Sequence, residues 1–314
     1  MSTSTAENNR SLDVVIASYR AKEYLRRCLA SIRDNAPATR ITVRVIDNAS
    51  GDGLADMVQT EFSEVDFTAN AENRGFAAAT NAGIEAGDTE YVLALNPDTE
   101  LFPGTLEQLL KLMDEHPEVG ICGPLLVRPS GDVDHAASRS FPTPLNSIGH
   151  FINLSRLPGA PAAVRGYAAP MDESGPVDAV NGAFMLIRRK ALEDVGLFDE
   201  GYWMYMEDLD LCYRMRQAGW LTWFEASIES EHVKGGSTGR YRSLRLNYAF
   251  HYGMYRFYRK HYAEDHSVLV NAAVYAGIVV KLVISSIRGV IGRTVLAFRR
   301  ALGRILSRAH LRKA

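Results

Sequence analysis

The sequence contains few cysteines, and none of them is placed for a cross-link or a zinc cluster. Cys28, Cys122 and Cys212 are odd in number and widely spaced along the 314 residues. Disulfide scaffolds and zinc sites need paired or closely spaced cysteines. The pattern therefore excludes a disulfide framework as the organising feature of the fold, and it favours reduced thiols in a cytosolic protein.

Two other signals are absent from the N-terminal part of the chain. Residues 1–10 are polar and lack the apolar stretch of a secretory signal, so we expect a disordered N-terminus and a catalytic part that faces the cytoplasm. The first predicted strand is followed by neither a GxGxxG fingerprint nor a Walker loop. This absence argues against a dinucleotide-dependent oxidoreductase.

A large excess of charge of one sign is also missing. The chain has 35 Lys and Arg residues against 37 Asp and Glu residues, so its formal net charge is −2. This balance argues against nucleic acid as a partner. The 46% of hydrophobic and 23% of charged residues are typical of a globular protein with a large core. The charge is nevertheless uneven, because no acidic residue follows Asp265.

The C-terminal part of the chain differs in character from the rest. Residues 268–287 contain one charged side chain, Lys281, and reach the length of a membrane span. Residues 288–313 then carry seven arginines and one lysine among apolar residues. Basic amphipathic helices bind anionic lipid surfaces. We therefore predict a helical, membrane-associating tail at 263–314, with a cytosolic helical hairpin packed on the catalytic domain as the alternative.

Between these ends, apolar runs of strand length alternate with stretches of helical periodicity. The predicted strands are 12–17, 41–46, 65–68, 91–95, 119–126 and 184–187, and the predicted helices are 24–32, 54–62, 76–86, a helix that begins near 103, 190–195 and 207–218. This alternation predicts an α/β, Rossmann-like fold with a mostly parallel sheet flanked by helices. Residues 129–177 are rich in Pro, Gly, Ser and Ala and too long for an ordinary connection, so we expect a functional loop or an insertion on the acceptor side there.

Polar and acidic residues follow two of the predicted strands. Asp47 comes directly after 41–46, and Asn96 and Asp98 follow 91–95. Open α/β sheets bind ligands outside the carboxyl ends of their strands. Asp47 can there accept hydrogen bonds from a base or a ribose, and Asp98 can bridge a divalent cation and a diphosphate. Turn and helix-cap chemistry is the alternative for both carboxylates.

Two further segments carry residues suited to an anionic or metal-bound ligand. Asn73 and Gly75 lie before a helix of small residues, and a helix N-terminus of this kind can approach a phosphate. His232 can join a carboxylate-bound cation, which would favour Mn²⁺ over the strictly oxygen-preferring Mg²⁺. An ordinary surface histidine is the alternative.

Glu207 and Asp208 open the predicted helix 207–218, directly after the aromatic segment 202–205. Acids in the first turn of a helix also complement the helix dipole, which is the purely structural explanation. Aromatic faces beside a carboxylate suit a sugar acceptor, and such a carboxylate can take a proton from a hydroxyl group as a general base. We favour the second interpretation.

Taken together and in order, these segments resemble glycosyltransferase family 2 over roughly residues 11–260. The matching segments are Val14-Val15-Ile16-Ala17-Ser18-Tyr19, Val45-Ile46-Asp47-Asn48-Ala49-Ser50, Asn73-Arg74-Gly75-Phe76, Asn96-Pro97-Asp98, Phe198-Asp199-Glu200 and Met204-Tyr205-Met206-Glu207-Asp208-Leu209-Asp210-Leu211. Within the family, 96–98, 206–211 and the His-x-x-x-Gly-Ser at 232–237 are similar to bacterial rhamnosyltransferases that act on lipid-linked cell-wall or O-antigen precursors.

The resemblance implies a GT-A domain at 11–262, with a nucleotide-sugar half at about 11–128 and an acceptor half at 129–262. It also implies an NDP-sugar donor, Mn²⁺ or Mg²⁺, and inversion at the anomeric carbon. The implied residues are Asp208 as catalytic base, Asp98 and His232 for the metal, Trp203 and Glu207 for the acceptor, and Ser18, Tyr19, Asp47, Asn73, Gly75, Asn81, Asn96 and Asp98 for the nucleotide sugar. Asn96 stands where many relatives have an aspartate, which leaves one carboxylate fewer for the metal.

The resemblance further implies dTDP-rhamnose as donor and a lipid-linked glycan as acceptor, at the cytoplasmic face of a bacterial membrane. The tail would then attach a peripheral or shallowly anchored enzyme to an anionic membrane surface. UDP-galactofuranose, UDP-GlcNAc and GDP-mannose remain alternative donors, and a non-catalytic membrane protein that binds sugar nucleotides or glycans remains an alternative function. A homo-oligomer is also left open.

Overall fold

The computed structural model describes residues 11–37, 39–143, 171–233 and 242–311, and side chains up to residue 294. The chain divides into two compact units, 1–237 and 238–314, and each is described by itself. The predicted disordered N-terminus at 1–10 and the glycine and serine of the 232–237 motif lie outside the described residues. The expected division between a nucleotide-sugar half and an acceptor half stays a prediction.

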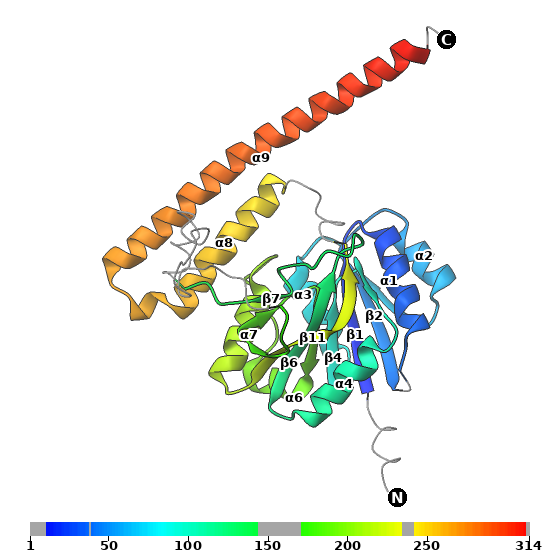
Figure 1. Cartoon of the computed structure of the whole chain (residues 1–314), viewed down its shortest axis with the longest axis vertical. Helices are drawn as coiled ribbons and strands as arrows, with labels where there is room; N and C mark the ends of the chain where they lie inside the picture. Colours follow the sequence, from blue (N-terminus) through cyan, green and yellow to red (C-terminus); the bar gives the residue numbers. More distant parts are fainter. Residues whose placement is uncertain (1–10, 38, 144–170, 234–241, 312–314) are drawn as a thin grey trace, which may run out of the picture. The chain divides into compact units, whose positions relative to one another are not determined.

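The described part of the first unit is built around a nine-stranded sheet in the order β3-β2-β1-β4-β10-β6-β11-β5, with β8 paired to β11 (Figure 1). A separate two-stranded sheet joins β7 and β9. The strands are β1 (Ser11–Ser18), β2 (Arg40–Asp47), β3 (Asp66–Ala69), β4 (Tyr91–Leu95), β5 (Thr99–Leu101), β6 (Val119–Val127), β7 (Ser138–Arg139), β8 (Gly175–Val177), β9 (Ala179–Val180), β10 (Phe184–Arg188) and β11 (Leu221–His232).

The sheet is mixed but mostly parallel, as predicted. Strands β3, β2, β1 and β4 run parallel to one another, and β6 and β11 share their direction because β10 pairs antiparallel with both β4 and β6. Strands β5 and β8 pair antiparallel with β11. The carboxyl ends of six strands therefore meet at one edge, where open α/β sheets bind their ligands.

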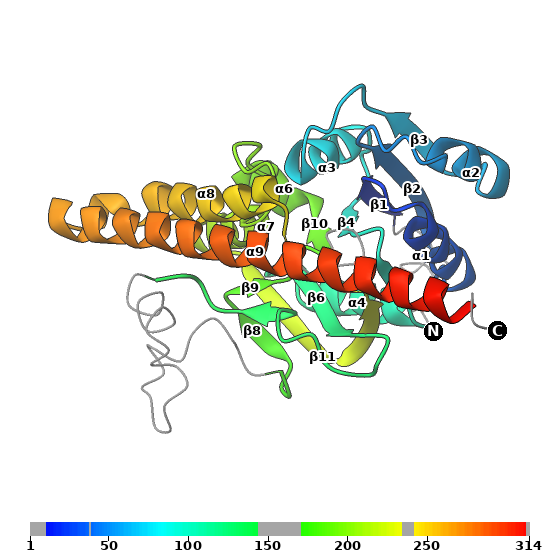
Figure 2. The same cartoon turned by 90° about the horizontal axis from the view of Figure 1, so that it is seen from above.

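Helices cover both faces of this sheet (Figure 2). Helices α3 and α6 lie on one face, α1 and α4 lie on the other, and α7 packs against β9 and β11. The helices of the first unit are α1 (Lys22–Asp34), α2 (Leu54–Glu61), α3 (Phe76–Glu85), α4 (Thr105–Glu115), α6 (Arg189–Val195) and α7 (Glu207–Gln217). Each corresponds to a predicted helix, and the buried residues of α1 and α4 repeat at helical spacing.

Close packing explains why α3 is made of small residues. A Cβ atom on Gly83 would lie 2.4 Å from a methyl carbon of Val15, so the helix backbone rests directly on β1. Ala79 packs with Ala17 and Ile46 in the same layer. The N-terminus of α3 is thereby brought close to the ends of β1 and β2.

A buried ion-pair network lies at the opposite end of β1. Asp13 is fully buried, and its carboxylate accepts hydrogen bonds from Arg189 at 2.9 Å, Thr89 at 2.8 Å and Arg44 at 3.3 Å. A Cβ on Gly87 would lie 1.9 Å from Oδ2 of Asp13, so only glycine leaves room for it. A buried carboxylate needs such partners to offset its desolvation.

The second unit consists of α8 (Leu244–His261), a short 3-10 turn η4 (Ala263–Asp265) and the long α9 (Val268–Leu311). This unit begins before residue 263, so α8 groups with the predicted tail. Helices α8 and α9 are joined by the Asn247 amide, which donates to Ser285 Oγ at 2.9 Å and to Ser286 Oγ at 2.8 Å. The predicted apolar and basic segments of the tail form one continuous helix.

Candidate active site

The candidate site is assembled at the carboxyl edge of the sheet. Ser18 ends β1 and pairs in register with Asp47, which ends β2. Asp98 follows β4 by three residues, and His232 ends β11. The strand order reverses at β1, which has β2 on one side and β4 on the other. Such a switch point opens a crevice for a ligand, so the topology brings together residues that are far apart in the sequence.

Asp47 is buried and bonds to the turn that follows it. Its carboxylate accepts hydrogen bonds from the Ser50 hydroxyl and from the Ser50 backbone N–H, the latter at 3.2 Å. The cap alternative considered for Asp47 is thus observed, and its contact with a nucleoside stays a prediction. Ser18 Oγ is buried and has no hydrogen-bond partner among the described residues, while Tyr19 is exposed.

The loop before α3 is held from both sides. Asn48, which follows Asp47, donates from its side-chain amide to Gly75 O at 3.0 Å. Trp203 contacts the other side, where its carbonyl accepts the Phe76 backbone N–H at 2.9 Å and its indole donates to Asn73 O at 3.4 Å. The segment predicted to bind the acceptor therefore touches the loop predicted to bind the donor.

Gly75 makes this contact sterically feasible. Its φ angle is +92°, and a Cβ atom at this position would lie 2.2 Å from the Trp203 carbonyl oxygen. The left-handed region is disfavoured for residues with a side chain, and the backbone oxygen leaves no space for one. Glycine is thus required by the approach of Trp203 as well as by the turn.

Asn81 takes a structural position in α3. Its amide donates to Phe198 O at 2.8 Å and to Glu200 at 3.1 Å, and its carbonyl accepts the Phe198 N–H at 3.1 Å. The side chain therefore ties α3 to the segment 198–200. Its predicted contact with the nucleotide sugar remains a prediction.

Asp98 and His232 face one another at the strand ends. His232 Nε2 lies 3.6 Å from Asp98 Oδ1, and the Val233 backbone N–H donates to Asp98 O at 2.9 Å. Burial disfavours the charge on His232, but the neighbouring carboxylates of Asp134 and Asp98 outweigh this effect and raise the pKa of His232 to about 9. The imidazole thus sits in a negative environment suited to a cation.

The donor set at this position fits a divalent metal ion. Asp98 is 3% exposed, and its Oδ1 atom has no hydrogen-bond partner among the described residues. A buried, unsatisfied carboxylate oxygen is costly unless something binds it, and carboxylate oxygen with imidazole nitrogen suits Mn²⁺. The described part of the chain contains no cluster of three or more His, Cys, Asp or Glu side chains arranged for a metal.

Asn96 bonds to the neighbouring segment through its backbone. Its N–H donates to Ala183 O at 3.0 Å, and Thr99 Oγ1 donates to the same carbonyl at 3.3 Å. These bonds attach the turn that carries Asp98 to the residue before β10. The predicted contact of the Asn96 side chain with the diphosphate stays a prediction.

Asp208 is held at the start of α7 by two other segments. Its Oδ2 atom accepts hydrogen bonds from the guanidinium group of Arg139 in β7 and, at 3.0 Å, from the backbone N–H of Gly182. Burial opposes the charge of Arg139, but the carboxylate of Asp208 outweighs it and raises the pKa of Arg139. Asp208 is thus fixed in position and charge-balanced.

Its neighbour Glu207 has a different environment. The side chain is 6% exposed, and its Oε2 atom has no hydrogen-bond partner among the described residues. Burial, and then the charge of Asp208, raise the pKa of Glu207 to about 8. Both acids follow Tyr205 and Met206, which have φ angles of 72° and 75°. Such strained backbone is concentrated at functional sites.

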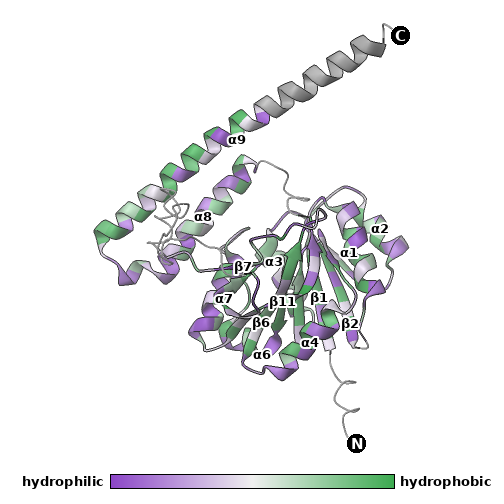
Figure 3. Cartoon of the chain, viewed as in Figure 1, coloured by the Kyte–Doolittle hydropathy of each residue, from purple (hydrophilic) through white to green (hydrophobic). Residues whose placement is uncertain are grey.

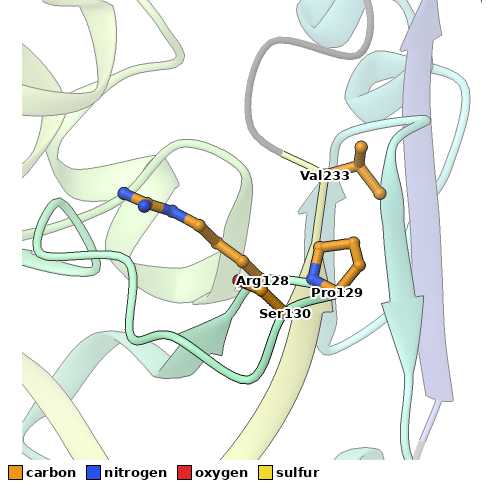
Figure 4. A pocket seen from close by; sticks show the side chains of 4 residues that line it. All are labelled: Arg128, Pro129, Ser130 and Val233. Atoms are coloured by element: carbon orange, nitrogen blue, oxygen red, sulfur yellow. The ribbon is translucent and has the colours of Figure 1, made fainter.

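A cavity of about 530 Å³ opens between the loop after β6 and the end of β11. Arg128, Pro129 and Ser130 line it from the loop after β6, and Val233 lines it from the end of β11 (Figure 4). Its volume is within the range of small-molecule sites, roughly 300–1,000 Å³. Since the Val233 N–H binds the backbone of Asp98, the cavity adjoins the candidate metal ligands.

The sequence did not reveal Arg139, Asp134, Gly182 or Asn48 as members of the site. Arg139 and Asp134 lie in the region 129–177, which has no periodicity and was predicted only to contain a functional loop. In the described parts of this region, Arg139 contacts Asp208 and Asp134 lies beside His232; a function for the loop stays a prediction. The contact of Gly182 with Asp208 joins segments 26 residues apart, so no local pattern could have indicated it.

Comparison with known proteins identifies relatives that share this architecture. A family profile described as Glycosyl transferase family 2 matches residues 13–196. The N-acetylglucosaminyl-diphospho-decaprenol L-rhamnosyltransferase of Mycobacterium tuberculosis (strain ATCC 25618 / H37Rv) is 33% identical over 241 residues, which cover 73% of this chain and 78% of the relative. Rhamnosyltransferase WbbL of Escherichia coli (strain K12) is 27% identical, over 66% of this chain and 77% of its own length.

Solved structures show the same fold at lower identity. The mannosyltransferase PcManGT from Pyrobaculum calidifontis, in complex with GDP-Man and Mn²⁺, has a TM-score of 0.54 at 16% identity, over 93% of this chain and 79% of that one. GalNAc-T7 with UDP, GalNAc and Mn²⁺ has a TM-score of 0.58 at 16% identity, over 81% of this chain and 48% of that one.

The family profile matches more than half of the chain, and the mycobacterial relative is similar along most of its length. The mostly parallel sheet flanked by helices agrees with the GT-A fold of the structural neighbours. The chain therefore belongs to glycosyltransferase family 2 and is a sugar-transferring enzyme with the GT-A fold.

Proposed function

We propose that this enzyme transfers L-rhamnose from dTDP-rhamnose to a lipid-linked glycan at the cytoplasmic face of a membrane, with inversion and with a divalent metal ion. The choice of donor and acceptor is supported by the 33% identity, over 73% of this chain, to an L-rhamnosyltransferase named for a decaprenol-linked acceptor. The geometry at Asp98, His232 and Asp208 supports the type of reaction.

In the proposed reaction, the residues of this chain divide between the donor and the acceptor. Asp98 and His232 would hold the metal ion beside the donor diphosphate. When bound, such an ion stabilises the negative charge that develops on the leaving diphosphate. Ser18, Asp47 and the loop at Asn73 would bind the nucleoside and its phosphates at the ends of β1 and β2.

The acceptor side of the proposed reaction centres on Asp208. An acceptor hydroxyl would attack the anomeric carbon from the face opposite the diphosphate, and Asp208 would take its proton. Arg139 and the Gly182 N–H would orient the carboxylate while the proton moves. Glu207, which is protonated at neutral pH when its pKa is about 8, would donate a hydrogen bond to the acceptor beside Trp203.

The second unit supports the proposed position at a membrane. Residues Val268–Thr294 of α9 form a 27-residue stretch long and apolar enough to cross a bilayer, and only 6% of its apolar window is buried (Figure 3). A helix in the core of a soluble domain would be mostly buried. The exposed apolar residues include Val280, Ile284, Ile287 and Ile291, and the arginines that follow suit anionic lipid headgroups.

Binding to lipid vesicles tests this proposed position. In the variant Ile284→Asn/Ile287→Asn we expect at least about tenfold weaker partition into anionic vesicles, because each buried isoleucine contributes roughly 1.5–3 kcal/mol. The matched control, Ile284→Leu/Ile287→Leu, keeps the apolar surface and should partition like the wild type. Equal partition of all three proteins would show that this face does not meet the membrane.

Calorimetric binding of nucleotide sugars tests the donor and the metal together. The full-length chain would be titrated with dTDP-rhamnose, UDP-galactofuranose, UDP-GlcNAc and GDP-mannose, each with and without Mn²⁺. We expect metal-dependent preference for dTDP-rhamnose. Preference for another donor would overturn the rhamnose assignment, and equal binding without Mn²⁺ would overturn the metal role of Asp98 and His232.

A further inference from the structure

Asp134 is a buried carboxylate that the sequence did not single out. It follows β6 in the loop 128–137 and is fully buried. Its backbone N–H donates to Leu126 O at 2.8 Å, and its carbonyl accepts the Ala137 N–H at 2.8 Å. The Ala136 N–H donates to its Oδ1 atom at 3.2 Å. The side chain is therefore held in one orientation by the backbone around it.

This orientation places Asp134 against His232. Oδ2 of Asp134 lies 3.5 Å from Nδ1 of His232, while Nε2 of the same ring lies 3.6 Å from Oδ1 of Asp98. The imidazole thus lies between two carboxylates, one at each nitrogen. Asp98 lies three residues after the end of β4, at the edge of the sheet where a ligand would bind, whereas Asp134 is fixed by the backbone of its own loop.

We propose that Asp134 is a positioning residue that fixes the tautomer and the ring orientation of His232, so that Nδ1 carries the proton and Nε2 presents its lone pair to the metal ion. The inference rests on the proposed metal-dependent function. Histidine ligands generally donate their second N–H to such a carboxylate, and loss of this partner typically costs about 10- to 100-fold in metal affinity.

Arg128 completes the arrangement on the far side of Asp134. Its Nη2 atom lies 3.9 Å from Oδ1 of Asp134, and its side chain is 38% exposed at the edge of the cavity. The guanidinium partly balances the charge of this carboxylate from the side of Oδ1, while Oδ2 is the oxygen that lies near His232.

In the variant Asp134→Asn, the group that faces His232 would change from a hydrogen-bond acceptor to a donor. Its carbonyl oxygen would accept the Ala136 N–H, so its NH₂ group would face Nδ1 of His232. A donor at this position favours the tautomer with its proton on Nε2, the nitrogen that the metal needs. Asp132→Asn is the matched control, because Asp132 lies in the same loop but is exposed, and its side chain accepts a hydrogen bond from the Ser130 hydroxyl at 2.8 Å.

The experiment measures Mn²⁺ binding to the full-length protein in the presence of dTDP, and separately UDP, by electron paramagnetic resonance. We expect about 10- to 100-fold weaker binding for Asp134→Asn, and wild-type affinity for Asp132→Asn. Spin-echo modulation from a coordinated ¹⁴N should be present in the wild type and in Asp132→Asn, absent in His232→Ala, and weakened in Asp134→Asn.

The outcomes separate the inference from the proposed function. Absence of Mn²⁺ binding to the wild type would overturn the metal-dependent function and the role of Asp134 with it. Binding and ¹⁴N modulation in Asp134→Asn equal to the wild type would overturn the role of Asp134 alone.

A measurement on the wild type avoids any dependence on folding of the variant. Histidine ¹H–¹⁵N correlations of the protein loaded with Mg²⁺ and dTDP should show the His232 proton on Nδ1, with His232→Ala giving the assignment. A proton on Nε2 would refute the inference directly.

Discussion

The buried carboxyl group of Glu207 makes a prediction about stability that depends on pH. Its pKa in the folded protein is about 8, against an ordinary value of 4.5, because burial and Asp208 disfavour its charge. The folded state therefore retains a proton that the unfolded chain releases. The stability that this proton provides is fully present below about pH 4.5 and is lost as the pH rises towards 8.

The variant Glu207→Gln removes this dependence because its amide is neutral at every pH. One proton retained on folding changes the free energy of unfolding by at most about 1.4 kcal/mol per pH unit. Relative to the wild type, Glu207→Gln should therefore gain stability steadily between about pH 5 and 8, by up to a few kcal/mol in total. A constant cost for burying the amide adds to all values equally and does not change this slope.

Urea unfolding followed by tryptophan fluorescence at pH 5, 6, 7 and 8 measures the effect. The control is Glu115→Gln at the end of α4, where the side chain is 60% exposed. The difference between this control and the wild type should be independent of pH. A difference between Glu207→Gln and the wild type that is equally flat would refute the argument that Glu207 is protonated in the fold.

Three further substitutions test other parts of the first unit. Gly75→Ala should destabilise the protein by roughly 2 kcal/mol or more, because its Cβ would lie 2.2 Å from the Trp203 carbonyl oxygen. The variant should also bind the donor more weakly. Urea unfolding and calorimetric titrations that are unchanged from the wild type would contradict the observed contact. Asp13→Asn should lower the free energy of unfolding by about 3–5 kcal/mol, because it leaves the Arg189 side chain, which is 18% exposed, beside a neutral group. Urea unfolding measures this change. A loss below about 1 kcal/mol would mean that the pair behaves like a surface ion pair. Asp208→Asn should reduce sugar transfer by about 10²- to 10⁴-fold while donor binding stays unchanged; transfer at the wild-type rate would exclude Asp208 as the base.

Much of the first unit could be predicted from local sequence patterns. The helices α1, α3, α4 and α7 have apolar residues at helical spacing, and β4 and β6 are continuous apolar runs because helices cover both faces of the sheet. Strand β11 was not predicted, because its twelve residues mix apolar, charged and small side chains and its register with β6 shifts twice. The short β5 exists only through its pairing with β11.

The grouping of α8 with α9 is another feature that local sequence patterns did not indicate. The sequence shows an apolar segment followed by arginines, and both occur in the single helix α9. The sequence did not show that α8 belongs with it. Contacts between distant residues join the two helices, such as the bonds from Asn247 to serines 38 and 39 residues away.

The sequence by itself determined where β1, β2 and β4 end, because these strands are apolar runs that stop at polar residues. Asp47 and Asp98 could therefore be named from the sequence alone, and His232 could be named from its motif. Only the tertiary structure decided what surrounds them. Arg139 reaches Asp208 across 69 residues and Asp134 reaches His232 from a loop without periodicity, and such contacts arise from chain topology and packing, which no local pattern in the sequence encodes.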